Sequence, residues 1–285
     1  MKRIRRTLLT AAALLVFLIL VGATYQSVST ALERREFPHL GRLVDIGGHQ
    51  LHIYCTGTGS PTVVLEAPAA GMSAVWGWVQ PAVAAITRVC GYDRAGLGWS
   101  EAGDQPFEPS EVPGQLHALL ERAEERGPYV VAGQGLGAAF ATSYAAHFGP
   151  EVAALVLIDP PTADAVAERN LMMRFVKASP WLARTGLLRA TRMMSSNTAG
   201  LPQHSAGALG AFLNRPDHLT RAARELSRWD DAVALADGAA LDPTVRVVRI
   251  EAAGPGRFAL LADEATARAA SMVLEEMVES VRTQR

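Results

Sequence analysis

Short apolar runs bounded by Gly, Pro or polar residues alternate along this chain with longer stretches that are typical of helices. The runs predict strands at residues 42–46, 50–55, 62–66, 87–92, 129–132, 152–158 and 245–250. Helices are expected at residues 76–86, 112–126 and 136–147, and near the C-terminus at about 263–282. This alternation indicates an α/β fold, in which helices cover both faces of a mostly parallel central sheet.

Two parts of the chain depart from the alternation. The runs that flank Gly47-Gly48 predict a β-hairpin, because paired glycines favour a tight turn. Residues from about 160 to 241 are rich in Ala, Arg, Leu and Met, are punctuated by Pro and Gly, and show no convincing strand. We expect this segment to form several short helices that make a helical lid.

The N-terminus combines a basic start with an apolar run. Residues 1–6 carry four cations, and residues 8–23 are then apolar except for Thr10. The pattern fits a membrane anchor of ~17–25 residues, and it also fits a signal peptide cleaved near Ala23. We expect an uncleaved anchor or signal segment at residues 1–25, a juxtamembrane linker at 26–40 and the folded body at 41–285.

The basic start also predicts where the body lies. The positive-inside rule keeps such residues in the cytoplasm, so we expect a single-pass protein of the cell membrane with its body on the extracytoplasmic side. Cleavage of the segment would instead secrete the body.

Composition excludes some classes of partner. The chain has 285 residues, 49% hydrophobic and 19% charged, with a formal net charge of −1. A balanced charge offers no basic field for nucleic acid, so none is expected as a partner. The two cysteines, Cys55 and Cys90, do not stand with other ligands at metal-binding spacing, and we expect no metal and no cofactor.

One turn carries the main functional signal. Residues 129–132 lead through the sequence Gly-Gln-Gly-Leu-Gly of residues 133–137 into an alanine-rich helix. This is the layout of the nucleophile elbow, G-x-S-x-G, in which a strained strand-to-helix turn exposes a serine hydroxyl. The central position holds Gly135, which has no side chain and cannot attack a substrate.

The chain resembles the α/β-hydrolase family, in particular its membrane-anchored bacterial esterase-like members. The stretches that carry the resemblance, including the specific sequence DRAGLGWS, are residues 43–66, 88–100, 127–160 and 263–278. The resemblance implies an α/β-hydrolase fold. It also implies a catalytic triad in the order Ser, Asp or Glu, His, in which the imidazole takes the proton of the attacking hydroxyl.

The positions that match the triad do not hold the required groups. Gly135 replaces the serine, and Arg257, which cannot accept a proton, stands where the family has histidine. No histidine follows His218. The family has two strands between the lid and the last helix, whereas only one is expected here, so the strand that precedes the catalytic acid looks deleted. Asp159 occupies an alternative acid position, although a turn-capping role fits it as well.

Other family positions predict a partly preserved pocket. Leu136 and Ala69 match the residues whose backbone N–H groups form the oxyanion hole. Gln134 stands where the family usually has histidine, and Pro68 where it usually has glycine. We therefore expect the ligand-binding residues to be Ala69, Gln134, Gly135 and Leu136.

Three further expectations concern pairs and packing. Glu66 is expected to partner Arg94, and Asp93-Arg94 to form a structural charge pair or turn. The resemblance places Cys55 and Cys90 on neighbouring strands, where either a disulfide or two buried thiols fit. Apolar lid residues are expected to pack on the sheet or to line a cavity: Met172, Met173, Phe175, Trp181, Met193, Met194 and Phe212.

Three functional hypotheses follow. The first is an exported, membrane-anchored pseudoenzyme that binds an apolar small molecule or a protein partner through the old pocket. The second is a working esterase with relocated groups, which needs His204, His218, Asp159 or Ser205 to converge on the elbow. The third is a decaying paralogue without a selected function. Lone lid histidines such as His204 and His218 are expected to be solvated.

Overall fold

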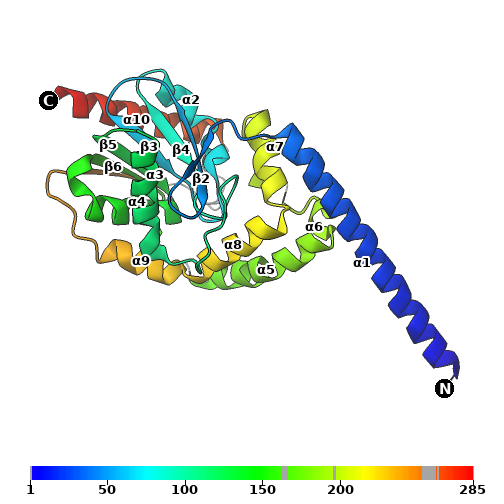
Figure 1. Cartoon of the computed structure of the whole chain (residues 1–285). Coiled ribbons are helices and arrows are strands. Elements are labelled where there is room, and N and C mark those ends of the chain that lie inside the picture. The colour runs from blue at the N-terminus through cyan, green and yellow to red at the C-terminus, as the bar shows by residue number, and fades with distance from the viewer. Residues whose placement is uncertain (1, 162–165, 195–196, 252–260, 262, 285) are drawn as a thin grey trace.

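The computed structural model describes residues 2–161, 166–194, 197–251, 261 and 263–284. In this part of the chain a seven-stranded sheet runs in the order β1-β2-β4-β3-β5-β6-β7 (Figure 1). The strands are β1 Arg42–Asp45, β2 Gln50–Thr56, β3 Thr62–Glu66, β4 Val89–Tyr92, β5 Tyr129–Gln134, β6 Val152–Ile158 and β7 Arg246–Ile250. β2 pairs antiparallel with β1 and β4, and the other neighbours are parallel, which confirms the expected α/β fold.

The central strands are apolar on both sides because helices cover both faces of the sheet. In β5, Val130 and Ala132 belong to one core cluster, and Tyr129 and Val131 belong to the cluster on the opposite face. Successive side chains of a strand point to opposite faces, so an unbroken apolar run serves both cores.

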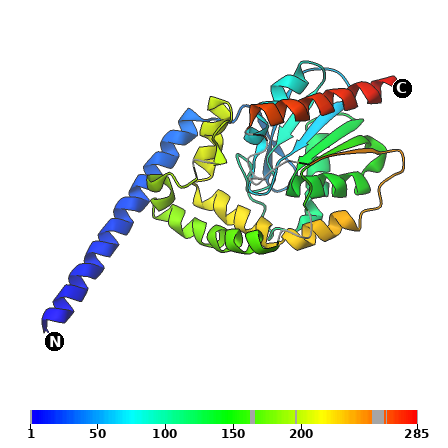
Figure 2. The same ribbon diagram turned by 180° about the vertical axis from the view of Figure 1, so that it is seen from behind.

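Two layers of helices flank the sheet. α2 Val79–Ala84 and α10 Glu264–Thr283 cover one face, and α3 Val112–Arg122 and α4 Leu136–His147 cover the other (Figures 1 and 2). The Asp263 side chain caps α10 by accepting a hydrogen bond from the Thr266 N–H at 2.8 Å. Short 3₁₀ turns complete the body: η1 Ser73–Trp76, η2 Pro109–Glu111 and η3 Gly149–Glu151.

Among the described residues, five helices lie between β6 and β7, and we call them the helical segment. They are α5 Val166–Arg184, α6 Leu187–Thr191, α7 Gln203–Phe212, α8 Pro216–Ser227 and α9 Trp229–Asp237. In its described residues the segment contains no strand, as expected. Met194 and Phe212 pack against the main core, whereas Trp181 and Met193 are exposed.

The N-terminal helix α1, Lys2–Glu36, projects from the body (Figure 1). Its apolar window has a mean hydropathy of 2.4 and is not buried in the protein, so the helix is long and apolar enough to span a membrane or to be a signal sequence. The expected linker at residues 26–40 is helical up to Glu36, because no Gly or Pro interrupts the chain between Gly22 and Pro38.

One predicted helix is wrong in its extent. Residues 76–86 do not form a single helix: the 3₁₀ turn η1 ends at Trp76, and α2 begins at Val79. Gly77 lies between the two, and a Cβ built there would meet the Ser205 Oγ at 2.3 Å. The close approach of the helical segment therefore excludes a side chain at Gly77, whose backbone is helical with φ −55° and ψ −28°.

Candidate functional site

The elbow forms as the sequence indicates. Gly135 follows β5 and precedes α4 with φ 55° and ψ −125°, in the left-handed half of conformational space. Its N–H donates to the Ile158 carbonyl at 2.9 Å, and its own carbonyl accepts from the Ala138 N–H at 2.9 Å. Gly135 is half-buried, so the tip of the turn remains accessible.

The three glycines of the elbow have different steric roles. A Cβ at Gly133 would lie 2.3 Å from the Gly137 carbonyl oxygen, and one at Gly137 would lie 2.4 Å from the Ala67 carbonyl oxygen. Both positions require glycine because helix and strands approach closely. At Gly135 a Cβ would meet only the Cβ of Pro68, at an ordinary 3.8 Å. The tip therefore has room for a side chain, although the residue at this position is glycine.

Two backbone donors flank this tip. Ala69, in the loop after β3, and Leu136, the first residue of α4, are both buried. Within the part of the chain that the structure describes, neither N–H donates a hydrogen bond. Buried N–H groups in native proteins nearly always have a partner. The arrangement therefore suits an oxygen atom of a ligand, and it lies where the sequence predicts the oxyanion hole.

A buried ion network supports the loop that carries Ala69. The Arg94 guanidinium donates to the carbonyl oxygens of Ala67 and Pro68 at 2.7 and 2.9 Å. It also pairs with Glu66 at 2.5 Å, as expected, and with Glu225 on α8 at 2.7 Å. Burial raises the pKa of the Glu66 carboxyl, and the Arg94 charge opposes that shift. Arg94 thus holds the loop and fastens the helical segment to the sheet.

The role of Glu225 was not predicted, although the sequence pattern of α8 indicates that this residue is buried. The buried residues of α8 recur at helical spacing, and Glu225 stands in that stripe beside Leu219, Ala222 and Leu226. A carboxylate on an apolar helix face requires a buried partner. That partner is Arg94, 131 residues away in the sequence.

Asp93 does not pair with Arg94, so the expected Asp93–Arg94 charge pair is wrong. Asp93 instead contacts the His52 ring at 3.0 Å and accepts from the backbone N–H groups of Ser73 and Trp99 at 2.6 and 2.9 Å. Burial opposes ionisation of Asp93, but these contacts outweigh burial and lower the pKa of its carboxyl. Asp93 therefore stabilises the turn within the DRAGLGWS stretch, residues 93–100, which confirms the alternative expectation of a turn.

Every histidine of the chain lies in its described part: His39, His49, His52, His117, His147, His204 and His218. Among the described residues, none of these rings hydrogen-bonds a Ser, Thr or Tyr hydroxyl. His204 on α7 is exposed, as expected, and its ring packs against Phe37. The structure thus shows no hydroxyl–imidazole couple at the elbow or elsewhere in this part.

His218 is buried, and its expected solvent exposure is wrong. The Gly98 N–H donates to its Nδ1 at 3.1 Å, so Nε2 carries the proton and donates to the Ala70 carbonyl at 3.1 Å. Burial lowers the pKa of the His218 imidazole, which keeps the ring neutral. Both nitrogens bind backbone groups, and the ring joins the Ala70 loop to α8.

Of the remaining candidates, Asp159 lies beside the elbow, because the Gly135 N–H donates to the carbonyl of the preceding Ile158. Asp159 follows β6 with φ 46°, and its N–H donates to the Ile250 carbonyl of β7 at 2.7 Å. Ser205 packs at Gly77. Arg257 lies outside the described residues. Within the described residues, β7 is the one strand between the helical segment and α10, as expected. Gln134, the last residue of β5, is buried beside the tip.

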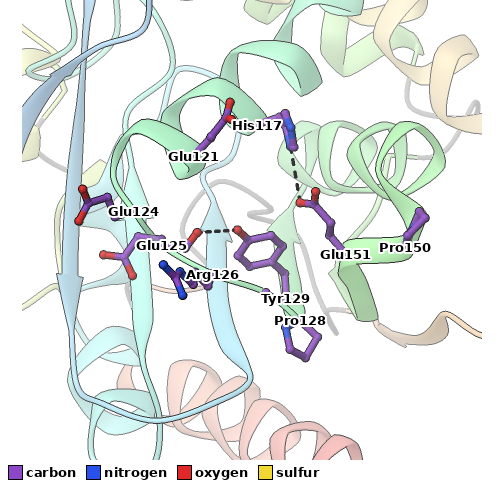
Figure 3. Close-up of a pocket in the computed structure, with 10 residues that line it drawn as sticks. His117, Glu121, Glu124, Glu125, Arg126, Pro128, Tyr129, Pro150 and Glu151 are labelled. Carbon is purple, nitrogen blue, oxygen red and sulfur yellow. Dashed lines mark hydrogen bonds and ion pairs between the residues drawn. The ribbon is translucent and has the colours of Figure 1, made fainter.

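A cavity of about 690 Å³ lies far from the elbow, at the amino end of β5 (Figure 3). Its lining is acidic, with Glu121, Glu124 and Glu125 on one side and Glu151 on the other. Tyr129 donates to the Glu125 carbonyl, and burial together with Glu151 raises the pKa of Tyr129 to about 12. The cavity contains neither the elbow nor its donors.

Cys55 and Cys90 form a disulfide across the antiparallel pair β2–β4, where they are register partners. Glu125 is close enough to join the two sulfurs in a three-ligand group. Its carboxylate, however, forms a bidentate pair with Arg88 at 2.6 and 3.0 Å. The disulfide and this pair occupy the donor atoms, so the group does not suit a metal ion.

A sequence model described as the α/β hydrolase fold matches residues 61–240. An uncharacterized protein of Schizosaccharomyces pombe is 31% identical over 113 residues, which is 39% of this chain and 21% of that protein. The chain therefore matches only about a fifth of the length of this curated relative.

Solved structures show the same architecture. The haloalkane dehalogenase DatA from Agrobacterium tumefaciens C58 superimposes with a TM-score of 0.65 at 15% identity, over 83% of this chain and 96% of that chain. The Cif epoxide hydrolase from Acinetobacter nosocomialis gives a TM-score of 0.67 at 15% identity, over 89% of this chain and 96% of that chain. At this identity the similarity shows the fold alone.

Proposed function

The chain belongs to the α/β-hydrolase fold family, and we propose that it is a membrane-anchored, exported member that binds an apolar small molecule without hydrolysing it. One observation carries this proposal: the tip of the elbow is Gly135, and two buried N–H donors beside it, on Ala69 and Leu136, have no acceptor among the described residues. The binding half of an acyl-transfer site is present without the attacking group.

The proposal depends on the absence of a nucleophile–base couple. Acyl transfer requires a hydroxyl or thiol and a base within hydrogen-bond reach of it. Both cysteines are in the disulfide, and no described histidine ring hydrogen-bonds a hydroxyl. The nearest hydroxyls that follow Gly135 in the sequence, Thr142 and Ser143, lie on α4 beyond the elbow. The Thr142 hydroxyl donates to the Ala138 carbonyl within that helix.

The donors indicate the chemistry of the ligand. Two buried N–H groups that lack an acceptor among the described residues favour a ligand with a carbonyl or carboxylate oxygen. The groups around them are apolar, with Pro68 beside the tip and Leu136 and Phe140 on α4 in one buried cluster with Ala69. We therefore propose a ligand with one such oxygen and an apolar body, held under the helical segment, which acts as a lid.

The N-terminal helix supports anchoring. α1 has 35 residues, more than the roughly 20 that a bilayer requires, and its apolar window is wholly exposed. By the positive-inside rule, the four cations of residues 1–6 would remain in the cytoplasm and the body would be exported. The disulfide fits an oxidising compartment.

The test uses the full-length chain in detergent micelles. A dansyl-labelled undecanoic acid with a free carboxylate reports binding, while p-nitrophenyl octanoate and a fluorophosphonate probe report hydrolysis. We expect saturable binding, no turnover and no covalent labelling. Gly135→Phe should abolish binding by filling the tip. Gly48→Phe is the matched control, because Gly48 also has positive φ and open space but lies in the hairpin turn.

Two outcomes would refute the proposal. Turnover of the ester that Gly135→Phe abolishes would identify a working hydrolase. Binding that both phenylalanine variants leave unchanged would place the ligand elsewhere.

A further inference from the structure

The second half of α1 is clamped to the helical segment where its apolar stretch ends. A Cβ at Gly22 would lie 2.0 Å from the Thr185 carbonyl oxygen, and one at Gly186 would lie 2.7 Å from the Gly22 carbonyl oxygen. Two glycines therefore allow the α5–α6 turn to touch the α1 backbone. The contact fixes the position of the α5–α6 turn along the axis of α1.

Polar contacts beyond the crossing hold the two parts together. The buried Gln26 side chain donates to the Asn214 carbonyl at 2.7 Å and accepts from Arg189 Nε at 3.0 Å. Arg189 also forms an ion pair with Glu33, one turn before the end of α1. The C-terminal part of α1 is thus a rigid extension of the body.

Large apolar side chains are exposed beside this crossing. Trp181 on α5 is 71% exposed, and Leu187 and Met193 around α6 are 47% and 49% exposed. Arg184 lies over the Trp181 ring, with its Cζ 5.0 Å from the ring centroid. Exposed Trp beside Arg is the composition of a membrane–water interface.

The charged residues in the surrounding sequence are all positive. Residues 170–216 contain no Asp or Glu, in a chain whose net charge is −1. They contain six cations: Arg174, Lys177, Arg184, Arg189, Arg192 and Arg215. Of these, Arg174, Lys177, Arg184 and Arg192 are exposed. One face of α5 is both basic and aromatic, because its exposed cations recur with Trp181 at helical spacing: Arg174, Lys177 and Arg184.

The orientation of α5 relative to α1 bears on where this face lies in relation to a bilayer. In Figures 1 and 2, α5 runs toward α1 and transverse to it, along the side of the body from which the N-terminal half of α1 projects. A bilayer that contains the apolar half of α1 would therefore meet the exposed face of α5.

We propose that the face formed by Arg174, Lys177, Trp181, Arg184, Leu187, Arg192 and Met193, here called the α5–α6 face, lies on the bilayer surface and binds anionic lipid headgroups. This inference rests on the proposed anchoring by α1. The apolar side chains enter the headgroup region, and the cations meet lipid phosphates. The lid of the proposed pocket is then in direct contact with the membrane, from which an apolar ligand can enter.

The experiment uses the full-length chain in nanodiscs of phosphatidylcholine, with and without phosphatidylglycerol. The discs carry a phosphatidylcholine that is spin-labelled near its headgroup and quenches nearby tryptophan. α1 has no tryptophan, and among the five tryptophans only Trp181 is exposed. We expect strong quenching that increases with phosphatidylglycerol and that Trp181→Phe largely removes. Trp229→Phe, a half-buried residue of α9, is the matched control and should leave the quenching in place.

A second pair of variants tests the charges. Arg184→Gln/Arg192→Gln should remove the dependence on phosphatidylglycerol, whereas Arg268→Gln on the exposed side of α10 should preserve it. Flotation of the chain with liposomes separates the two proposals. A chain that floats but is not quenched at Trp181 overturns the α5–α6 face and leaves the anchor intact, whereas a chain that does not float overturns both.

Discussion

Arg94, two residues after β4, and Glu225, on α8, form a fully buried ion pair in which Nη2 and Oε1 are 2.7 Å apart. Glu66 shares the same guanidinium, so two carboxylates meet one cation. The Tyr92 hydroxyl donates to Glu66, and burial raises the pKa of Tyr92 so that it remains a donor. The pair joins the helical segment to the loop that presents the Ala69 N–H.

Replacement of Arg94 and replacement of Glu225 should lower the free energy of unfolding by different amounts. Arg94→Met leaves two buried carboxylates without a cation and should lower the free energy of unfolding by about 3–5 kcal/mol. Glu225→Gln keeps one carboxylate for Arg94 and should cost about 1–2 kcal/mol, because an amide still accepts a hydrogen bond. Chemical denaturation of the detergent-solubilised chain measures both. Equal losses would contradict the shared-cation arrangement.

The three elbow glycines should differ in their tolerance of alanine. Gly135→Ala should cost about 1–2 kcal/mol, because only the positive φ opposes a side chain there. Gly133→Ala and Gly137→Ala force a Cβ against backbone oxygens and should cost more than about 4 kcal/mol. Thermal and denaturant unfolding provide the comparison. A tolerated Gly137→Ala would show that α4 is not as close to β3 as described here.

Restoration of the hydroxyl alone should not restore catalysis. Gly135→Ser should fold, since the tip has space, but it should show neither ester turnover nor fluorophosphonate labelling, because no described imidazole reaches the tip. The double variant Gly135→Ser/Arg257→His should become labelled by the probe. Arg257→His alone is the control and should remain inactive. Activity of Gly135→Ser by itself would mean that an existing group serves as the base.

Asp93 should make stability depend on pH in the acidic range. Its pKa in the folded state is below the ordinary value of 3.8, so the carboxylate stabilises the fold above that value. The contribution is lost as the pH falls through the lower, folded-state pKa. Asp93→Asn should cost about 2 kcal/mol at neutral pH, and the difference from wild type should shrink below about pH 4. Asp104→Asn, at an exposed position, is the control and should show no such difference.

The disulfide should contribute measurably to stability. Cys55 and Cys90 close a loop with a sequence separation of 35 residues, and the Cys55→Ser/Cys90→Ser variant should lose about 3–4 kcal/mol. Denaturation with and without reductant compares the variant with wild type. Reduction should destabilise wild type and leave the variant unchanged; a wild type indifferent to reductant would contradict the bridge.

Sequence patterns predicted the elements of the sheet well where burial is complete. The strands at 62–66 and 152–158 and the helix at 136–147 have the expected bounds, because apolar runs and a glycine turn define them locally. The 76–86 segment is divided between η1 and α2 although Gly77 keeps helical dihedral angles, and no local pattern marks this change from a 3₁₀ turn to an α-helix.

The candidate site was predicted in part for the same reason. The elbow follows from residues 133–137, and the Glu66–Arg94 pair follows from the family resemblance. The burial of His218 and the role of Glu225 depend on how α8 docks, and this is decided by contacts with residues more than a hundred positions away. Such contacts are set by tertiary packing rather than by propensity.

At the elbow, close backbone contacts leave no room for a Cβ at Gly133 or Gly137, whereas Gly135 at the tip has room for one. The scaffold of this turn and its reactivity are therefore separable properties. Loss of the side chain at the tip can therefore remove bond cleavage while strand, helix and backbone donors keep their places, so chains with one architecture can diverge into hydrolases and proteins that no longer cleave.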